Sequence, residues 1–161
     1  PWTIRIHDLG DWHEARYVKA WLIAARARPL CKLWFYTRSF QEKKLFAAIT
    51  ELAALPNCQG WLSIDAENFE AGLLAYAQEP GVWKLALLQE KRERIEELLP
   101  ELIKTAKVKE LVSFPVHRGG RHVEPVVDAG LYTCPAVVGV YKLESSAAKL
   151  RPCQTCSFCL P

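Results

Sequence analysis

Residues 32–64 read KLWFYTRSFQEKKLFAAITELAALPNCQGWLSI and contain a complete strand–helix–strand unit. The first segment, Lys32–Tyr36, is short and rich in aromatic residues, which indicates a strand. In Gln41–Leu55 the apolar residues recur at helical spacing, and Pro56 ends this helix. Trp61–Ile64 is the next strand. Because two strands joined by one helix run parallel with a right-handed crossover, the unit predicts a parallel sheet.

The same alternation of strand and helix extends over most of the chain. Strands are expected at Thr3–His7, Lys32–Tyr36, Trp61–Ile64, Val82–Leu88 and Glu110–Phe114. Helices are expected at Glu14–Arg28, Gln41–Leu55, Phe69–Gln78 and Arg92–Lys107, the last kinked or split at Pro100. The nearly even spacing favours an α/β fold in which a parallel (β/α) sheet forms a partial TIM-type barrel. No G-x-G-x-x-G turn follows the first strand, so a dinucleotide-binding fold loses support.

The composition is that of a globular protein, with 50% hydrophobic and 24% charged residues. No apolar run approaches the roughly 20 residues of a membrane span, and a net charge of +3 is weak support for a nucleic-acid partner. Six cysteines without a secretion signal favour a reducing, cytoplasmic compartment. The absence of methionine and the start directly on a strand pattern predict a fragment. Residues 1–125 are expected to form the barrel, and residues 126–161 an irregular cysteine-rich tail.

The tail holds the strongest motif of the sequence, a C-x-x-C-x-x-C run preceded by one further cysteine. Thiolates at this spacing can point at one centre, which suits a zinc ion or an iron–sulfur cluster and leaves both open. Disulfides or unliganded thiols are the alternatives. Cys31 and Cys58 stand alone and are expected to be structural. The expected metal ligands are Cys134, Cys153, Cys156 and Cys159.

Polar residues follow the expected strands, and ligands of parallel α/β folds bind at the carboxyl ends of strands. The densest group is the turn His7-Asp8-Leu9-Gly10-Asp11, where two carboxylates and an imidazole could hold an amine, a ribose or a metal. Gly10 permits close approach of the backbone to a ligand. Asp8 is expected to contact the ligand, whereas Asp11 either does so or caps the following helix.

Ser63 and Asp65 share one face at the end of the third strand. In a barrel this face could be the lumen, where a buried aspartate needs partners. Asp65 therefore either meets a ligand, such as a ribose hydroxyl, or is satisfied by backbone amides.

The chain resembles a phage- and plasmid-borne family, the gene product eighty-eight-like proteins. The resemblance rests on IRIHDLGDW at residues 4–12, WFYTRS at residues 34–39 and the closing cysteine run, and it extends from Ile4 to Cys159. That family is in turn similar to radical S-adenosylmethionine (SAM) enzymes, whose partial barrel carries a catalytic cluster in a loop after its first strand.

The resemblance implies that the five expected strands correspond to the second to sixth strands of that barrel. On this mapping Asp8, Gly10 and Asp11 would hold the amino end of SAM, and Ser63 and Asp65 its ribose. The first strand, with its C-x-x-x-C-x-x-C motif, would lie upstream. The four tail cysteines would then hold an auxiliary 4Fe–4S cluster or a zinc ion.

The functional expectation is a radical-SAM-like iron–sulfur protein fragment that is not active as this chain alone, because the sequence contains no C-x-x-x-C-x-x-C. The alternative is a non-enzymatic, zinc-stabilised phage or plasmid accessory module that binds a partner or nucleic acid.

Overall fold

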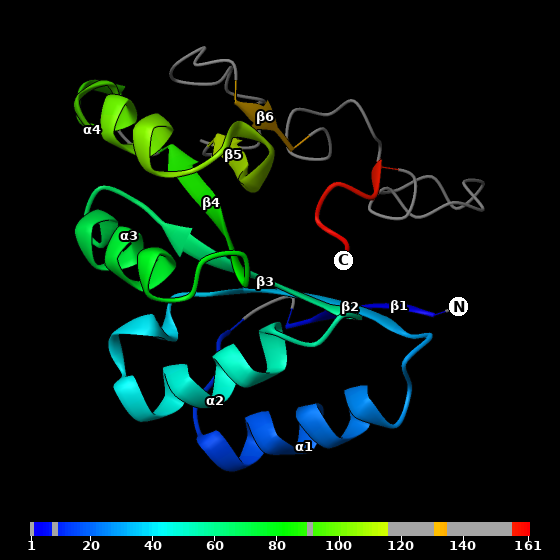
Figure 1. The fold of residues 1–161 in the computed structure, drawn as a ribbon. Helices are drawn as coiled ribbons and strands as arrows, with labels where there is room; N and C mark the ends of the chain where they lie inside the picture. Colours follow the sequence, from blue (N-terminus) through cyan, green and yellow to red (C-terminus); the bar gives the residue numbers. More distant parts are fainter. Residues whose placement is uncertain (1, 8–9, 90–91, 116–130, 135–155) are drawn as a thin grey trace. The chain divides into compact units, whose positions relative to one another are not determined.

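A computed structural model describes residues 2–7, 10–89, 92–115, 131–134 and 156–161. Strands and helices alternate as predicted, and two short 3-10 turns, η1 and η2, lie between them (Figure 1). The elements are β1 (Thr3–Ile6), α1 (Ala15–Arg26), β2 (Lys32–Thr37), η1 (Ser39–Gln41), α2 (Lys43–Ala53), β3 (Cys58–Ile64), α3 (Phe69–Gln78), β4 (Trp83–Gln89), α4 (Arg92–Thr105), η2 (Val108–Glu110), β5 (Leu111–Pro115) and β6 (Tyr132–Thr133).

The strands of the described residues form one sheet in the order β1-β2-β3-β4-β5-β6. β1 pairs with β2, β2 with β3, β4 with β5 and β5 with β6, and each of these pairs is parallel. Strand order therefore equals chain order, as in a (β/α) barrel, whereas a doubly wound sheet reverses its order at one point. The predicted α/β class and its barrel-type topology are confirmed. The short strand β6 was not predicted.

Contacts divide the chain into two compact units. The first comprises residues 1–63, 70–84 and 159–161, and the second comprises residues 64–69 and 85–158. The predicted boundary near residue 125 falls outside the described residues and stays a prediction.

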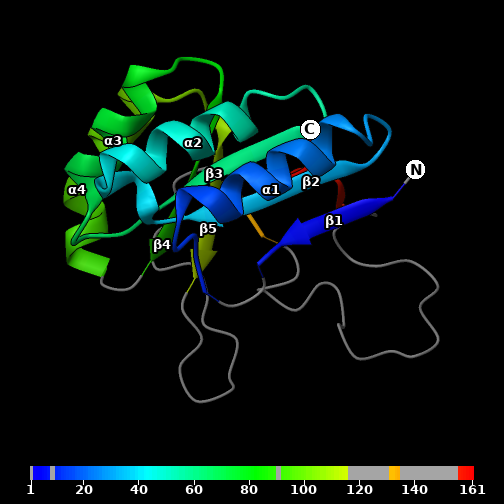
Figure 2. The same cartoon turned by 90° about the horizontal axis from the view of Figure 1, so that it is seen from below.

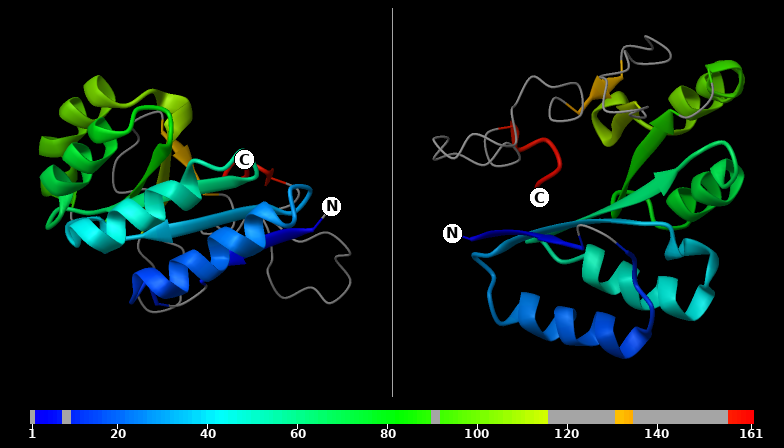
Figure 3. Two further views of the ribbon diagram at one scale, coloured as in Figure 1. Left: turned by 60° about the horizontal axis from the view of Figure 1, so that its bottom comes forward. Right: turned by 180° about the vertical axis from the view of Figure 1, so that it is seen from behind.

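In the first unit, α1 and α2 run side by side across one face of β1, β2 and β3 (Figures 2 and 3). Each helix presents an apolar stripe to the sheet at the expected 3.6-residue period. The stripe of α1 consists of Val18, Leu22 and Ala25, and that of α2 consists of Leu45, Phe46, Ile49, Leu52 and Ala53.

Strand β2 buries side chains on both of its faces. On the helix-covered face, the Phe35 ring meets Trp83 edge-on at 6.1 Å between centroids, and Trp83 stacks on Phe46 of α2 at 5.3 Å. Tyr36 alternates to the opposite face, where its ring lies 6.1 Å from that of its register partner Trp61. Such two-sided burial is typical of parallel sheets and explains the apolar and aromatic run Leu33–Tyr36 within β2.

Gly60 of β3 permits the close approach of the Trp83 ring. A Cβ atom at this position would lie 2.4 Å from Cζ3 of Trp83 and 2.9 Å from Cβ of Ala53. Trp83 is 1% exposed and is held between other rings, so it has little room to move away.

The second unit has its own apolar core and a buried polar pair. Its buried side chains are Leu85, Leu87, Leu102, Leu111 and Val112, among others. The buried Gln89 amide donates a hydrogen bond from Nε2 to the Ser113 hydroxyl at 2.6 Å. Helix α4 continues through Pro100, so of the two predicted alternatives the split is wrong and the kink stays a prediction.

Among the described residues, each helix is too short or too polar to cross a bilayer.

We expect Gly60→Ala to lower the free energy of unfolding by about 1–3 kcal/mol, because the new methyl group overpacks the core against the Trp83 ring. Chemical denaturation of the variant and the wild type measures this loss. In a Trp83→Leu background the same substitution should cost less, since the smaller side chain leaves room for the methyl group. An equal cost in both backgrounds would show that the Trp83 contact is not the reason for glycine.

Candidate functional site

A cavity of about 350 Å³ opens at the carboxyl ends of β1 and β2, within the first unit. Its lining is polar and charged, and it combines two strand ends with the loop that follows β1. The lining residues are Arg5, His7, Gly10, Asp11, Tyr36, Thr37, Arg38 and Ser63. Three of the five predicted ligand contacts, Gly10, Asp11 and Ser63, are thus brought together.

A larger hollow of about 710 Å³ lies between α2 and α3, and apolar side chains such as Phe46 and Leu74 line much of it. No strand end opens into this hollow, and Lys43 and Glu79 are its charged lining residues. The strand-end cavity is therefore the better candidate for polar chemistry.

Asp11 holds the loop after β1 against the end of β2. Its Oδ1 accepts hydrogen bonds from the Trp12 amide and the Thr37 hydroxyl, both at 2.7 Å. Its Oδ2 accepts the Arg38 amide at 2.5 Å. Asp11 does not cap α1, because the N-cap position of that helix is Glu14. The carboxylate shapes the cavity wall, and its charge faces whatever binds there.

Gly10 has a φ of 85°, in the left-handed region that favours glycine. A Cβ atom at this position would meet nothing within 4 Å, so backbone conformation rather than space explains the glycine. Asp8, the neighbouring predicted ligand contact, lies outside the described residues and stays a prediction.

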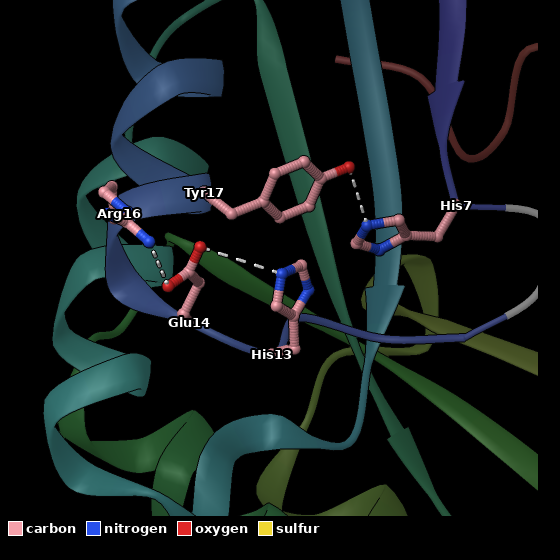
Figure 4. A network of polar contacts seen from close by, with 5 residues as sticks. All are labelled: His7, His13, Glu14, Arg16 and Tyr17. Carbon is pink, nitrogen blue, oxygen red and sulfur yellow. Dashed lines mark hydrogen bonds and ion pairs between the residues drawn. The ribbon is translucent and has the colours of Figure 1, made fainter.

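His7 lines the cavity and belongs to a cluster of rings. Figure 4 shows its ring beside that of Tyr17. Its φ of 60° is unusual for a residue with a side chain. Its ring lies 4.6 Å from Trp12 and stacks on Tyr17 at 5.6 Å, and its Nε2 is 3.2 Å from the Tyr17 hydroxyl. The Nδ1 atom is buried and has no hydrogen-bond partner among the described residues.

Burial lowers the pKa of His7 below its ordinary value of 6.5, because desolvation disfavours the charged ring. The nearby Asp11 carboxylate raises that pKa and His13 lowers it further, both less than burial does. His7 is therefore mainly neutral near pH 7, with one ring nitrogen able to accept a proton or a hydrogen bond.

Arg5 and Tyr36 are lining residues that the sequence did not single out, whereas Arg38 belongs to the polar residues expected at the strand ends. The Arg5 guanidinium lies 5.4 Å from the centroid of the Tyr36 ring, a cation–π distance. Alternation along β1 and β2 puts Arg5 and Tyr36 on the same face of the sheet as Ser63. The alternation along each strand can be read from the sequence. Which residues of the three strands lie side by side depends on the strand register, which only the structure gives.

Asp65 belongs to the second unit and is buried at a helix start. Its Oδ1 accepts hydrogen bonds from the amides of Glu67 at 2.9 Å and Asn68 at 3.2 Å, and Asn68 Oδ1 accepts the Asp65 amide at 2.9 Å. These reciprocal bonds satisfy backbone groups just before α3. They match the structural alternative considered for Asp65, and its ribose contact stays a prediction.

Two of the predicted metal ligands receive contacts from tyrosines. The Tyr36 hydroxyl donates a hydrogen bond to Sγ of Cys159 at 3.0 Å, and the Tyr132 hydroxyl lies 2.8 Å from Sγ of Cys156. A thiolate at either position can accept such a bond, so both sulfurs suit metal ligation. Cys134 and Cys156 form no disulfide with another described cysteine.

Cys153 lies outside the described residues, and no group of three potential metal ligands gathers among those that are described. The four-cysteine site therefore stays a prediction. Burial raises the pKa of Cys58 to about 12, which keeps this thiol neutral and agrees with its predicted structural role.

A family model described as Gene product 88 matches residues 1–161, the whole of the chain. The chain belongs to the Gene product 88 family. The resemblance to this family seen in its motifs is thereby confirmed, whereas the similarity to radical SAM enzymes stays a prediction. No curated protein and no solved structure matches this family member significantly.

In this Gene product 88 protein, we expect the stabilising contribution of neutral His7 to be lost on acidification. Because the folded-state pKa of His7 lies below 6.5, the unfolded chain binds the proton more readily, and stability falls as the pH decreases through about 6.5. His7→Asn tolerates a positive φ and does not titrate. Between about pH 8 and pH 5 the free energy of unfolding should fall more for the wild type than for the variant. Parallel curves would contradict this.

Proposed function

We propose that this chain is an iron–sulfur protein whose strand-end cavity binds the amino-acid end of SAM. The observation that carries the proposal is the gathering of Gly10, Asp11 and Ser63 around one cavity of about 350 Å³. The sequence resemblance implies Gly10 and Asp11 as contacts for the amino end of SAM and Ser63 as a contact for its ribose.

The charges of the cavity are complementary to a zwitterion. Arg5 and Arg38 bring positive charge that can pair with an α-carboxylate, and guanidinium groups bind carboxylates with favourable geometry. Asp11 brings negative charge for an α-ammonium group; its Oδ1 accepts two of the described hydrogen bonds and its Oδ2 one, so Oδ2 is the oxygen that could accept a bond from this group. The amino-acid end of SAM carries both charges, on two groups attached to one carbon atom.

The volume is at the lower end of the roughly 300–1,000 Å³ that small-molecule sites usually have. It accommodates the methionyl part of SAM more readily than the whole molecule. Ser63 lies on the face of β3 that continues from Tyr36, where a ribose hydroxyl bound beyond the amino-acid group could accept or donate a hydrogen bond.

The metal centre is assigned to Cys134, Cys153, Cys156 and Cys159, with a 4Fe–4S cluster as the first choice. Thiolates are the ligands that such clusters take, and the tyrosine hydroxyls beside Cys156 and Cys159 are typical outer partners of ligating groups. When bound, a cluster supplies one-electron chemistry. Because the chain contains no C-x-x-x-C-x-x-C, we propose binding of SAM and not its reductive cleavage by this chain alone.

A zinc ion on the same cysteines, in a non-enzymatic module that binds a partner or nucleic acid, is the second candidate. It is favoured by contacts that anchor the chain end. Trp61 Nε1 donates to the Cys159 carbonyl at 3.1 Å, and Lys32 Nζ donates to the Pro161 carbonyl at 3.0 Å. Such anchoring is what a structural metal site reinforces.

Anaerobic reconstitution with iron and sulfide should give a brown protein with broad absorption near ~400 nm, as cysteine-ligated clusters do. Cys153→Ala and Cys159→Ala should each lose most of the bound iron, because each removes a ligand. Cys31→Ala is the matched control and should retain it. A colourless wild-type protein that contains one zinc ion would refute the cluster and favour the second candidate.

Isothermal titration with SAM should detect binding by the wild type, and Arg5→Gln should weaken it about tenfold or more. The physical reason is the loss of a charged hydrogen bond, which contributes about 1.5–3 kcal/mol. Arg28→Gln is the matched control, because Arg28 is exposed and is not a lining residue of the cavity. Equal affinities for Arg5→Gln and the wild type would contradict the assignment of this cavity.

A further inference from the structure

We propose that the hollow between α2 and α3 is the interface through which two copies of this chain form a symmetric dimer. The hollow has a volume of about 710 Å³ and lies within the first unit. It shares no lining residue with the strand-end cavity, and none of its lining residues is a cysteine. The proposal therefore does not depend on the function proposed above.

One stripe of each helix builds the hollow. The lining positions recur at intervals of three and four residues, which is the spacing of a single helix face. Small side chains at several of these positions leave the space between the helices unfilled, while the buried Phe46 and Ala75 lie at its base. The helical lining residues are Lys43, Phe46, Ala47 and Thr50 of α2 and Ala71, Leu74, Ala75 and Gln78 of α3.

Helix α3 is apolar on its outer side as well as toward the core. Its sequence is FEAGLLAYAQ, in which Glu70 is the single charged residue, and the Leu74 side chain beside the hollow is 64% exposed. A helix on a solvated surface normally carries charged residues on the face away from the core. The composition of α3 is instead that of a helix covered on both sides, and exposed apolar surface of this kind marks an interaction site.

The two charged residues of the lining, Lys43 and Glu79, have opposite signs and lie at opposite ends of the hollow. Lys43 is the first residue of α2, and Glu79 directly follows the last residue of α3. Because the preceding strands β2 and β3 are parallel, both helices run back along the sheet in the same direction. Neither side chain forms an ion pair with another residue of the described part of the chain.

This surface is complementary to itself. A twofold axis that crosses both helices reverses the direction of the hollow, so Lys43 of one copy meets the end that carries Glu79 in the other, and the same pair forms again at the opposite end. Leu74 lies near the middle of α3 and thus near this axis, where it can enter the hollow of the other copy and leave water. A second copy therefore supplies the apolar side chain and both charges that the surface requires.

Sedimentation equilibrium of the full chain should show that the wild type dimerises reversibly. Leu74→Glu should weaken dimerisation roughly a hundredfold or more, because the symmetric interface takes up the change twice and each copy buries a new carboxylate. Ile23→Glu is the matched control, because Ile23 on α1 is 68% exposed and does not line the hollow. It should dimerise like the wild type, and circular dichroism should show that both variants are folded.

Charge reversal tests the pairing of Lys43 with Glu79. Lys43→Glu and Glu79→Lys should each weaken the dimer about severalfold, since each creates two like-charged pairs across the interface. An equimolar mixture of the two variants should recover a heterodimer, in which both pairs again have opposite charges. Lys19→Glu, at an exposed position of α1 outside the hollow, is the matched control and should leave the dimer unchanged.

Three results would overturn the proposal. A wild type that remains monomeric at about 1 mM would leave the hollow to a partner of different sequence. A dimer that Leu74→Glu weakens no more than Ile23→Glu does would place the contact elsewhere on the chain. A mixture of Lys43→Glu and Glu79→Lys that fails to recover the dimer would exclude the symmetric arrangement.

Discussion

The two-sided burial of β2 is the constraint on which the first unit depends. Phe35 on one face is enclosed by the rings of Trp12 and Trp83, beneath the helices. Tyr36 on the other face meets Trp61 and Cys159. A parallel strand with both faces covered contributes apolar area to two packing layers at once. Helices α1 and α2 cover one face (Figures 2 and 3). On the other face, Tyr36 and Trp61 contact Cys159 near the end of the chain.

The cavity exists because the loop after β1 is tied to the end of β2. Asp11 links the loop to the end of β2, because its carboxylate accepts hydrogen bonds from the Thr37 hydroxyl and the Arg38 amide. Charge-assisted bonds of this kind are stronger than neutral ones. The left-handed backbone at Gly10 turns the loop so that Asp11 can reach β2. One carboxylate thereby shapes the wall of the cavity and brings negative charge beside the arginines of the lining.

Tyr36 connects the two candidate sites. Its ring lines the cavity, whereas its hydroxyl donates to Cys159. A ligand that contacts the ring and a metal that binds the sulfur would act on the same rigid side chain. Since coupling between two sites is reciprocal, each would affect the binding of the other by the same factor.

The sequence by itself determined the order of strands and helices, because hydrophobic periodicity and proline positions are local signals. It also determined that Gly10, Asp11 and Ser63 belong to strand ends, and parallel strands bring such ends to one edge. The roles of Arg5, Tyr36 and Trp61 were decided by the tertiary structure alone, because they depend on strand register. The bond between Tyr36 and Cys159 joins residues 123 positions apart. No local pattern encodes such a contact, since only packing brings the chain end back to β2.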